Sequence, residues 1–258
     1  MTPLVLSLLA AGGTCAAAPP PAPDAPSPPA RQVAPPAPLS PDPDLDAELL
    51  EIDALAENVS DLTASFEQTK KSPLLKKPLV SRGTVKVKGS RVRWDTASPH
   101  ATVMLVDATE VRIHYSEQRV LEVYELDDSL RRLIASPVPR LKSVREQFEI
   151  ARATEQLDSG GQLLALDLAA RAEDLSSHLS KLRVTLDRKS GLVTRVEMTD
   201  PDGEESAIAF TDATTNSGLN DRDFDLTLPE GTRVSKPLEG LSRPTPATPH
   251  KALGEGGK

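Results

Sequence analysis

The chain has 258 residues, a net charge of −8 at pH 7 and an aromatic content of only 3%. A nucleic-acid-binding protein needs a basic face, so the acidic balance argues against nucleic acid as a partner. The single cysteine is Cys15. The rest of the chain therefore has no disulfide and no cysteine-ligated metal.

Residues 1–18 are predicted to be a secretion signal. Leu4 to Ala11 form a hydrophobic run, and Ala16-Ala17-Ala18 fit a small-residue cleavage site. Cys15 offers an alternative, a lipid-anchored N-terminus, but the preceding Gly12-Gly13-Thr14 match a lipidation motif poorly. The sequence favours soluble export to the periplasm, and the run is too short to cross a membrane.

Two segments are predicted to lie outside the folded domain. Residues 19–43 hold half of the 24 prolines and cannot bury a core, so they are expected to form a semi-rigid linker. Residues 236–258 are rich in Pro, Gly and Thr and are expected to form a disordered tail. Residues 44–235 remain as one domain, long enough for a sizeable core.

The domain is predicted to open with an amphipathic helix over residues 45–58. Leu45, Leu49, Ile52 and Leu55 fall on one stripe at helical spacing, with Ala56 and Val59 continuing it, and Asp44 precedes them as an N-cap candidate. Such a helix needs a surface to cover.

Alternating apolar and polar residues then predict a meander of antiparallel strands with one apolar face. The expected strands are 61–71, 79–88, 91–95, 102–106, 111–115 and 119–126. Asp107-Ala108-Thr109-Glu110 is expected to form the turn between the fourth and the fifth.

Two helices, 129–135 and 138–147, are expected next, interrupted by Pro137 and Pro139. The remaining predicted elements are strands 148–157, 163–168, 182–187, 192–199, 206–212 and 224–228, with a short helix at 173–179. This order predicts an α+β fold. Its core is a strongly curved antiparallel sheet, a half-open β-barrel of about eleven strands, with a helical lid on the concave side.

Several spaced motifs carry a family resemblance. They are Phe66-x-Gln68, Gly83 opening a strand, Val92-x-Trp94 before Ser98-Pro99, Asp107 in a turn, Thr199-Asp200-x-x-Gly203 before Ile208-x-Phe210, and Phe224-x-Leu226-x-Leu228-Pro229-x-Gly231. In order and spacing they resemble the LolA family, the periplasmic carriers of outer-membrane lipoproteins. Leu75-x-x-Pro78-Leu79-x-Ser81-x-Gly83 is similar to a divergent branch of that family.

The resemblance implies a hydrophobic cavity that shields the acyl chains of a lipoprotein or a related lipid. It also implies a monomer that takes its cargo from an inner-membrane exporter and passes it to an outer-membrane acceptor. The residues expected to contact the acyl chains are Phe66, Val85, Val87, Val92, Trp94, Val111 and Ile113 from the strands and Leu133, Ile134, Leu141 and Val144 from the lid. Where the family has a lid-latching arginine, this chain reads Val87-Lys88-Gly89-Ser90, which leaves Lys88 and Arg91 as candidates.

Two other functions stay open. The same fold could sense or store lipid in the envelope, anchored through Cys15. It could also be a structural envelope protein, because alternation alone does not distinguish a packed barrel from a hollow one.

Nothing in the sequence predicts an enzyme, a metal site or a cofactor. The four histidines, His100, His114, His178 and His250, have no partners at metal-ligand spacing. The glycine pattern of a nucleophile elbow is absent from the sequence.

Overall fold

The computed structural model describes residues 42–125, 137–139, 141–153, 161–177 and 179–237. The predicted signal, most of the predicted linker and tail, and the predicted helix over 129–135 lie outside these residues. Pro43, assigned above to the linker, is the first residue of a helix.

One sheet of twelve strands organises the described part of the chain, in the order β12-β6-β5-β4-β3-β2-β1-β11-β10-β9-β8-β7. The strands are β1 Asp61–Lys71, β2 Leu79–Lys88, β3 Arg91–Ser98, β4 Thr102–Val106, β5 Glu110–Tyr115, β6 Val120–Glu125, β7 Phe148–Arg152, β8 Leu163–Ala170, β9 Lys181–Asp187, β10 Val193–Thr199, β11 Glu205–Thr215 and β12 Arg233–Ser235. Neighbours are antiparallel except β12 and β6, which are parallel.

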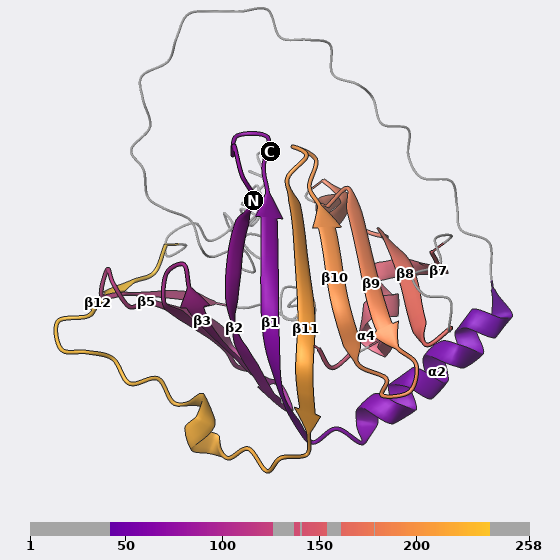
Figure 1. The fold of residues 1–258 in the computed structure, drawn as a ribbon, viewed down its shortest axis with the longest axis horizontal. Coiled ribbons are helices and arrows are strands. Elements are labelled where there is room, and N and C mark those ends of the chain that lie inside the picture. Colours follow the sequence, from indigo (N-terminus) through magenta and orange to yellow (C-terminus); the bar gives the residue numbers. More distant parts are fainter. Residues whose placement is uncertain (1–41, 126–136, 140, 154–160, 178, 238–258) are drawn as a thin grey trace, which may run out of the picture.

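The sheet is strongly curved and does not close. Its two halves bend back from β1 and β11 to the same side, the concave side, where the helix α4 (Leu141–Gln147) lies (Figure 1). The curved antiparallel sheet predicted from the sequence is confirmed, and the described helical cover on its concave side is small. Among the described residues, no helix is both long and apolar enough to cross a membrane.

The helix α2 (Pro43–Glu57) leads into β1 and differs from the prediction at its N-cap and at Leu55. Its N-cap is Asp42, not Asp44, because the Asp42 carboxylate accepts hydrogen bonds from the first free backbone N–H groups. Proline occupies the first turn, where it costs no hydrogen bond. Near the C-terminal end of the helix, Ala56 is buried as predicted, whereas Leu55 is 38% exposed.

The predicted strand over 224–228 is wrong. These residues follow a short 3-10 helix, η1 (Asp221–Phe224), which Asn220 and Asp223 cap reciprocally. The chain then forms β12 at residues Arg233–Ser235, which pairs with β6 at the sheet edge. Another short helix, α5 (Glu173–Ser176), lies within the predicted segment 173–179.

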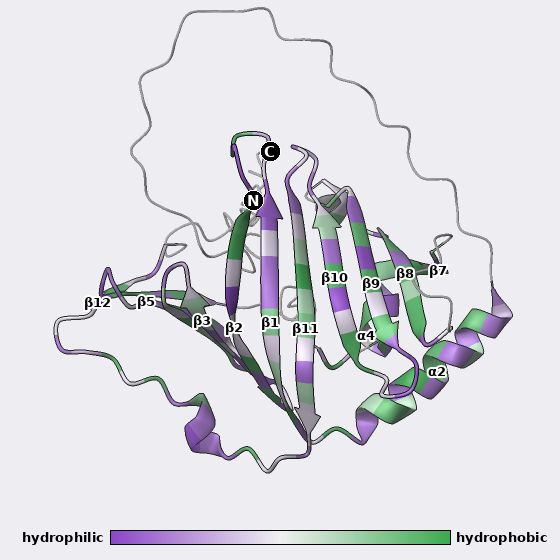
Figure 2. Cartoon of the chain, in the orientation of Figure 1, coloured by the Kyte–Doolittle hydropathy of each residue, from purple (hydrophilic) through white to green (hydrophobic). Residues whose placement is uncertain are grey.

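A single apolar core lies on the concave side. Residues of α2, including Leu45, Leu49 and Ile52, and Leu141 of α4 belong to the same buried cluster as the inward-facing residues of the strands. Figure 2 shows the alternation behind this arrangement, since green and purple segments follow one another along the strands. Alternate side chains of a strand point to opposite faces, so one face can be apolar and the other polar.

Candidate lipid-binding face

The pairing register determines which residues share the concave face. Val87 pairs with Val92, and Val85 pairs with Trp94, so these four side chains point the same way. The same cross-strand pairing extends these rows of inward-pointing side chains into β4, β5 and β6. The concave residues from β1 to β6 are Leu62, Ala64, Phe66, Gln68, Ser81, Gly83, Val85, Val87, Val92, Trp94, Thr96, Thr102, Met104, Val106, Val111, Ile113, Tyr115, Val120, Glu122 and Tyr124.

All seven strand residues predicted to contact acyl chains lie on this face and are buried. Val85 and Val111 are fully buried, and Ile113 is 1% exposed. The concave residues of the other half of the sheet continue the apolar surface, with Leu164, Leu166 and Ile208 among the most buried. The seven predicted strand residues therefore share one buried face, and their role in binding stays a prediction.

Three aromatic rings meet at the centre of the face. Phe66 and Trp94 have ring centroids 4.7 Å apart in an edge-to-face arrangement, and Phe210 of β11 lies 5.8 Å from Trp94. Phe210 was missing from the predicted lining, although its register opposite Phe66 places it there. The Trp94 indole N–H is buried and has no hydrogen-bond partner among the residues that the structure describes.

Gly83 makes this arrangement of rings possible. A Cβ atom at Gly83 would lie 2.0 Å from the Asp95 carbonyl oxygen and 2.9 Å from the Phe66 ring. Any side chain at this position would displace the Phe66 ring and the backbone of β3, so the motif glycine has a packing role here.

The helix α4 contributes the described part of the predicted lid. Leu141 is 3% exposed, and Val144 packs partly buried against the core. The Leu141 backbone N–H donates to the Asp53 carboxylate at 3.1 Å, which ties α4 to α2. Burial raises the pKa of that carboxyl. Leu133 and Ile134 lie outside the described residues.

A few polar groups interrupt the concave face, and most are paired. Gln68 donates to Ser206 at 3.2 Å. At the rim, Lys70 pairs with Glu204 at 2.8 Å, and Arg152 of β7 pairs with Glu48 of α2 at 2.9 Å. The last contact places α2 over the β7 end of the concave face.

A second polar group was not predicted from the sequence. Glu122 of β6 accepts hydrogen bonds from Tyr115 and Tyr124, at 3.2 and 2.7 Å, both at the same oxygen, Oε2. Burial, followed by the bond to Glu122, raises the pKa of the Tyr124 hydroxyl. The sequence holds no reliable signal for this group, because Glu122 and Tyr124 alternate with Leu121 and Val123, and alternation alone does not tell which of the two sides is concave.

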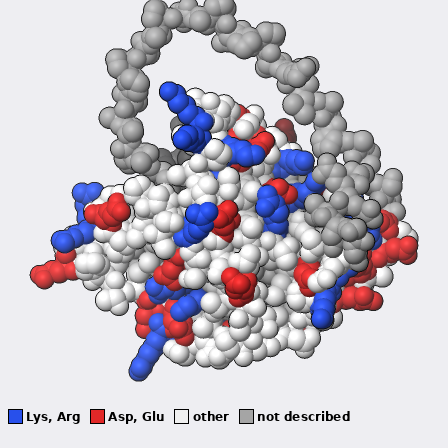
Figure 3. Space-filling view, viewed as in Figure 1, with Lys and Arg blue, Asp and Glu red and all other residues white. Residues whose placement is uncertain are grey.

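The convex face is polar. Basic and acidic side chains lie close together across it in Figure 3. Arg183 pairs with Asp167 at 2.7 Å and Arg195 with Glu197 at 3.0 Å. Exposed ion pairs of this kind contribute little to stability and leave the outer surface solvated.

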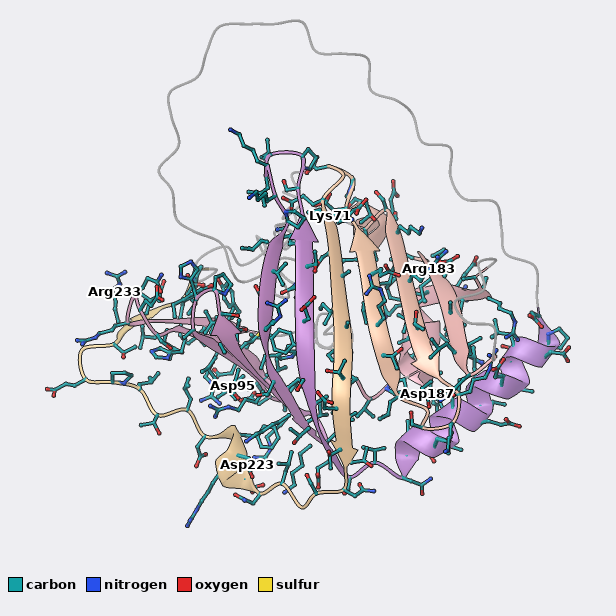
Figure 4. The ribbon with its side chains drawn as sticks, in the orientation of Figure 1. Lys71, Asp95, Arg183, Asp187, Asp223 and Arg233 are labelled. Atoms are coloured by element: carbon teal, nitrogen blue, oxygen red, sulfur yellow. The ribbon has the colours of Figure 1, made fainter. Side chains whose placement is uncertain are left out.

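Residues 216–232, named here the C-terminal strap, run along the convex side below β2 and β3 (Figure 1). Lys88 and Arg91 both pair with Asp221 of the strap, and Lys86 pairs with Asp223. In Figure 4, Asp223 lies below Asp95 of β3. Lys88 and Arg91 therefore hold the strap on the convex side, and neither latches a lid on the concave face.

The histidines stay isolated in the described part of the chain. His114 is buried on the convex side, and His100 lies 3.2 Å from Glu117 at the surface. His178 and His250 lie outside the described residues. Among the residues that the structure describes, no three His, Cys, Asp or Glu side chains group closely enough to hold a metal ion.

The family profile of the outer membrane lipoprotein carrier protein LolA matches residues 57–227. This match spans more than half of the chain. The chain belongs to the LolA family. The domain is thus a binding module of the lipoprotein-carrier type. Among curated proteins, none matches the chain.

Solved structures with related folds include an uncharacterised conserved protein from Thermus thermophilus, at 12% identity and a TM-score of 0.49, covering 75% of this chain and 99% of that one. The lipoprotein LppX from Mycobacterium tuberculosis has 13% identity and a TM-score of 0.43, covering 72% and 100%. The LolA superfamily protein NE2245 from Nitrosomonas europaea has 14% identity and a TM-score of 0.39, covering 70% and 97%.

Proposed function

We propose that this LolA-family domain carries the acyl chains of a lipoprotein, or of a related lipid, against the concave face of its sheet. The observation that most supports the proposal is the continuous apolar surface across the strands, centred on Phe66, Trp94 and Phe210. Members of the family are carriers, so the mechanism is binding and release and requires no catalytic group.

The proposed contacts are the predicted set. They are Phe66, Val85, Val87, Val92, Trp94, Val111 and Ile113 of the strands, with Leu133, Ile134, Leu141 and Val144 of the lid. Apolar burial contributes about 25 cal/mol per Å², so an aliphatic face binds acyl chains even with few rings. Moderate affinity suffices, since the cargo must be released to an acceptor.

Entry of an acyl chain requires α4 to move away from the concave face. A helix of 7 residues is too short to be stable by itself and depends on its packing. Its described polar contacts with α2 go to two aspartates. Asp53 accepts from the backbone of Leu141, at 3.1 Å, and of Lys142, and Arg145 pairs with the Asp46 carboxylate at 3.2 Å and donates to its carbonyl at 3.4 Å. These few contacts suit a lid that opens without unfolding the sheet.

In this proposal the protein works as a monomer in the periplasm, between an inner-membrane exporter and an outer-membrane acceptor. The signal predicted at residues 1–18 supports export. Storage or sensing of lipid would use the same face and differ only in the partner that follows.

A structural role is the second candidate, favoured by one observation. Val85, Val111 and Leu166 are fully buried in the described conformation, as in a filled core. In that case the concave face would bind nothing, and the family likeness would extend to the fold alone.

Native mass spectrometry of the full chain purified from its own envelope, followed by lipid extraction, tests both candidates. A carrier retains a stoichiometric lipid or acylated peptide, or takes one up when lipids are offered. A mass without ligand, unchanged after lipids are offered, would favour the filled core and contradict the proposal.

A lid variant sharpens this test. Val144→Gln places an amide at the half-buried position of α4 and should reduce lipid uptake, while Lys142→Gln, at an exposed position of the same helix, should not. Equal lipid uptake by the two variants would show that α4 is not part of the binding face.

A further inference from the structure

The charged side chains of the concave face differ in whether an opposite charge pairs with them. Lys70 and Arg152 both form ion pairs at the rim. Glu122 lies between Ile113 and Ser235 in the register, half-buried, and no cation pairs with it within the described residues. A carboxylate on an apolar face without a counter-charge is costly unless something else compensates it.

Hydrogen bonds compensate the Glu122 charge in part, and they reach only one of its two oxygens. Tyr115 and Tyr124, the only tyrosines of the chain, both donate to Oε2 of Glu122. The other oxygen, Oε1, receives no hydrogen bond from the residues that the structure describes. The two phenols therefore fix the carboxylate and leave one oxygen available as an acceptor.

The neighbouring charges do not fill this role. Arg112 of β5 lies on the convex face, where it pairs with Asp107 and Glu110. Arg233 of β12 sits at the sheet edge beside Val120, is exposed and makes no ion pair with Glu122 (Figure 4). Within the part of the chain that the structure describes, the Glu122 carboxylate therefore remains available to a cationic group of a ligand.

The apolar residues beside Glu122 indicate what kind of ligand would fit. Its cross-strand row runs through Ile113 and Met104 to Trp94, three strands away, or about 14 Å along the sheet. A molecule with a cationic head at Glu122 would therefore lay an apolar tail across the proposed acyl-binding face. Aromatic rings also attract ammonium groups, and both tyrosines flank the carboxylate.

We propose that Glu122, oriented by Tyr115 and Tyr124, binds the ammonium group of an acylated cargo. This inference rests on the proposed function and adds a chemical preference to it. An ammonium has three donors, and one of them matches the available Oε1 oxygen. Two sources carry this group: the headgroup of an amine phospholipid and the free α-amine of a diacylated N-terminal cysteine.

The test uses the full chain, freed of lipid, and measures competition by native mass spectrometry. One sample contains vesicles of phosphatidylethanolamine and phosphatidylglycerol in equal amounts with identical acyl chains. A second contains two lipopeptides of one sequence, diacylated with a free α-amine or additionally N-acylated. We expect the amine form to be enriched about tenfold in at least one sample, the effect of one charge-assisted hydrogen bond. The sample showing enrichment identifies the source.

Glu122→Gln should abolish the enrichment while total uptake persists, because the apolar face is unchanged. Glu125→Gln is the matched control, since Glu125 is exposed on the same strand and points to the opposite face. Tyr124→Phe keeps the ring and removes one donor, so it should reduce the enrichment only in part.

Equal uptake of amine and non-amine forms in both samples, or enrichment that survives in Glu122→Gln, would overturn this inference and leave the carrier proposal standing. Uptake of no lipid or lipopeptide at all would overturn both.

Discussion

The two faces of the sheet differ in polarity and in the contacts that they make. The concave face is an apolar surface with isolated polar groups, and one buried cluster joins it to α2 and α4. The convex face carries ion pairs, and the C-terminal strap is attached to it through Lys86, Lys88, Arg91 and Arg93. Strand alternation lets one sequence meet both needs, so the binding face can change while the outer contacts maintain the curvature.

The largest expected effect comes from Gly83 of β2, which lies opposite Phe66 near the centre of the concave face. Gly83→Ala should lower the free energy of unfolding by about 4 kcal/mol or prevent folding, because the new Cβ collides with the Asp95 carbonyl and the Phe66 ring. Chemical denaturation measures the loss. Gly89→Ala is the control, since Gly89 has φ +59° in open space and should lose only about 1 kcal/mol. Similar losses at the two sites would contradict the packing role of Gly83.

Paired leucine truncations compare the faces directly. Leu166 on the concave side is fully buried in the main cluster, and Leu105 on the convex side is 2% exposed but outside that cluster. Leu166→Ala should cost about 3–4 kcal/mol and Leu105→Ala about 2 kcal/mol, because the cost depends on how far the surroundings can collapse. Denaturation midpoints of the two variants give the two losses. An equal loss, or a larger loss for Leu105→Ala, would show that the convex side has its own rigid core.

The sequence predicted the concave face well because a period of two residues assigns every side chain of a strand to a face. Strands 61–71, 79–88 and 102–106 match the structure residue for residue. Alternation does not reveal which face bends inward or whether anything covers it. Phe210 was missed for a related reason, since its neighbour Phe66 is distant in sequence and only the β1–β11 pairing brings the rings together.

The convex strap was harder to predict. Phe224-x-Leu226-x-Leu228 alternates as a strand does, but Phe224 is buried against the Arg91 guanidinium, 5.0 Å from the ring centre. Asn220 and Asp223 fold the preceding residues into η1. Contacts between residues far apart in sequence therefore override the local pattern. The Glu122 group was missed because a lone carboxylate in a strand usually faces water.

Weakening one contact of the C-terminal strap should affect only the residues near that contact. Arg93 donates to the Asp225 carbonyl at 2.6 Å and forms a bidentate pair with Asp95. Arg93→Lys loses the fork geometry and should cost about 1–2 kcal/mol. Hydrogen exchange should accelerate at residues 221–225 and stay unchanged in β7 to β10. Arg195→Lys, in an exposed convex pair, should cost less than about 0.5 kcal/mol. Faster exchange throughout the sheet would show that the strap maintains the whole fold.

The other anchor of the strap is acid-sensitive. Burial alone would raise the pKa of Asp61, but hydrogen bonds from Ser217 and Gly218 outweigh it and hold that pKa below its ordinary value of 3.8. A carboxyl with a lowered folded pKa stabilises the protein above its unfolded pKa, and this contribution is lost as the pH falls through the folded value. Asp61→Asn should therefore flatten the decline in stability below about pH 4. Urea midpoints measured from pH 6 to pH 2 test this. An unchanged slope would assign the decline to the other carboxyl groups whose pKa values are lowered, which are Glu48, Asp107, Asp187, Glu204, Asp221 and Asp223.

Only a small stability change is expected for one substitution at the centre of the concave face. Trp94→Phe shortens a ring system and also removes a buried N–H that has no partner, so no hydrogen bond is lost. The two effects oppose each other, and the net change should stay within about 1 kcal/mol. Tyr124→Phe, by contrast, loses a bond to Glu122 and should cost more.

A large stability loss for Trp94→Phe would mean that ring volume alone fixes the aromatic group, as in a filled core. A small loss with weaker uptake of ester-linked acyl chains would mean that the indole N–H finds its acceptor in the cargo. The polar atoms that the concave face leaves unpaired would then be its recognition elements.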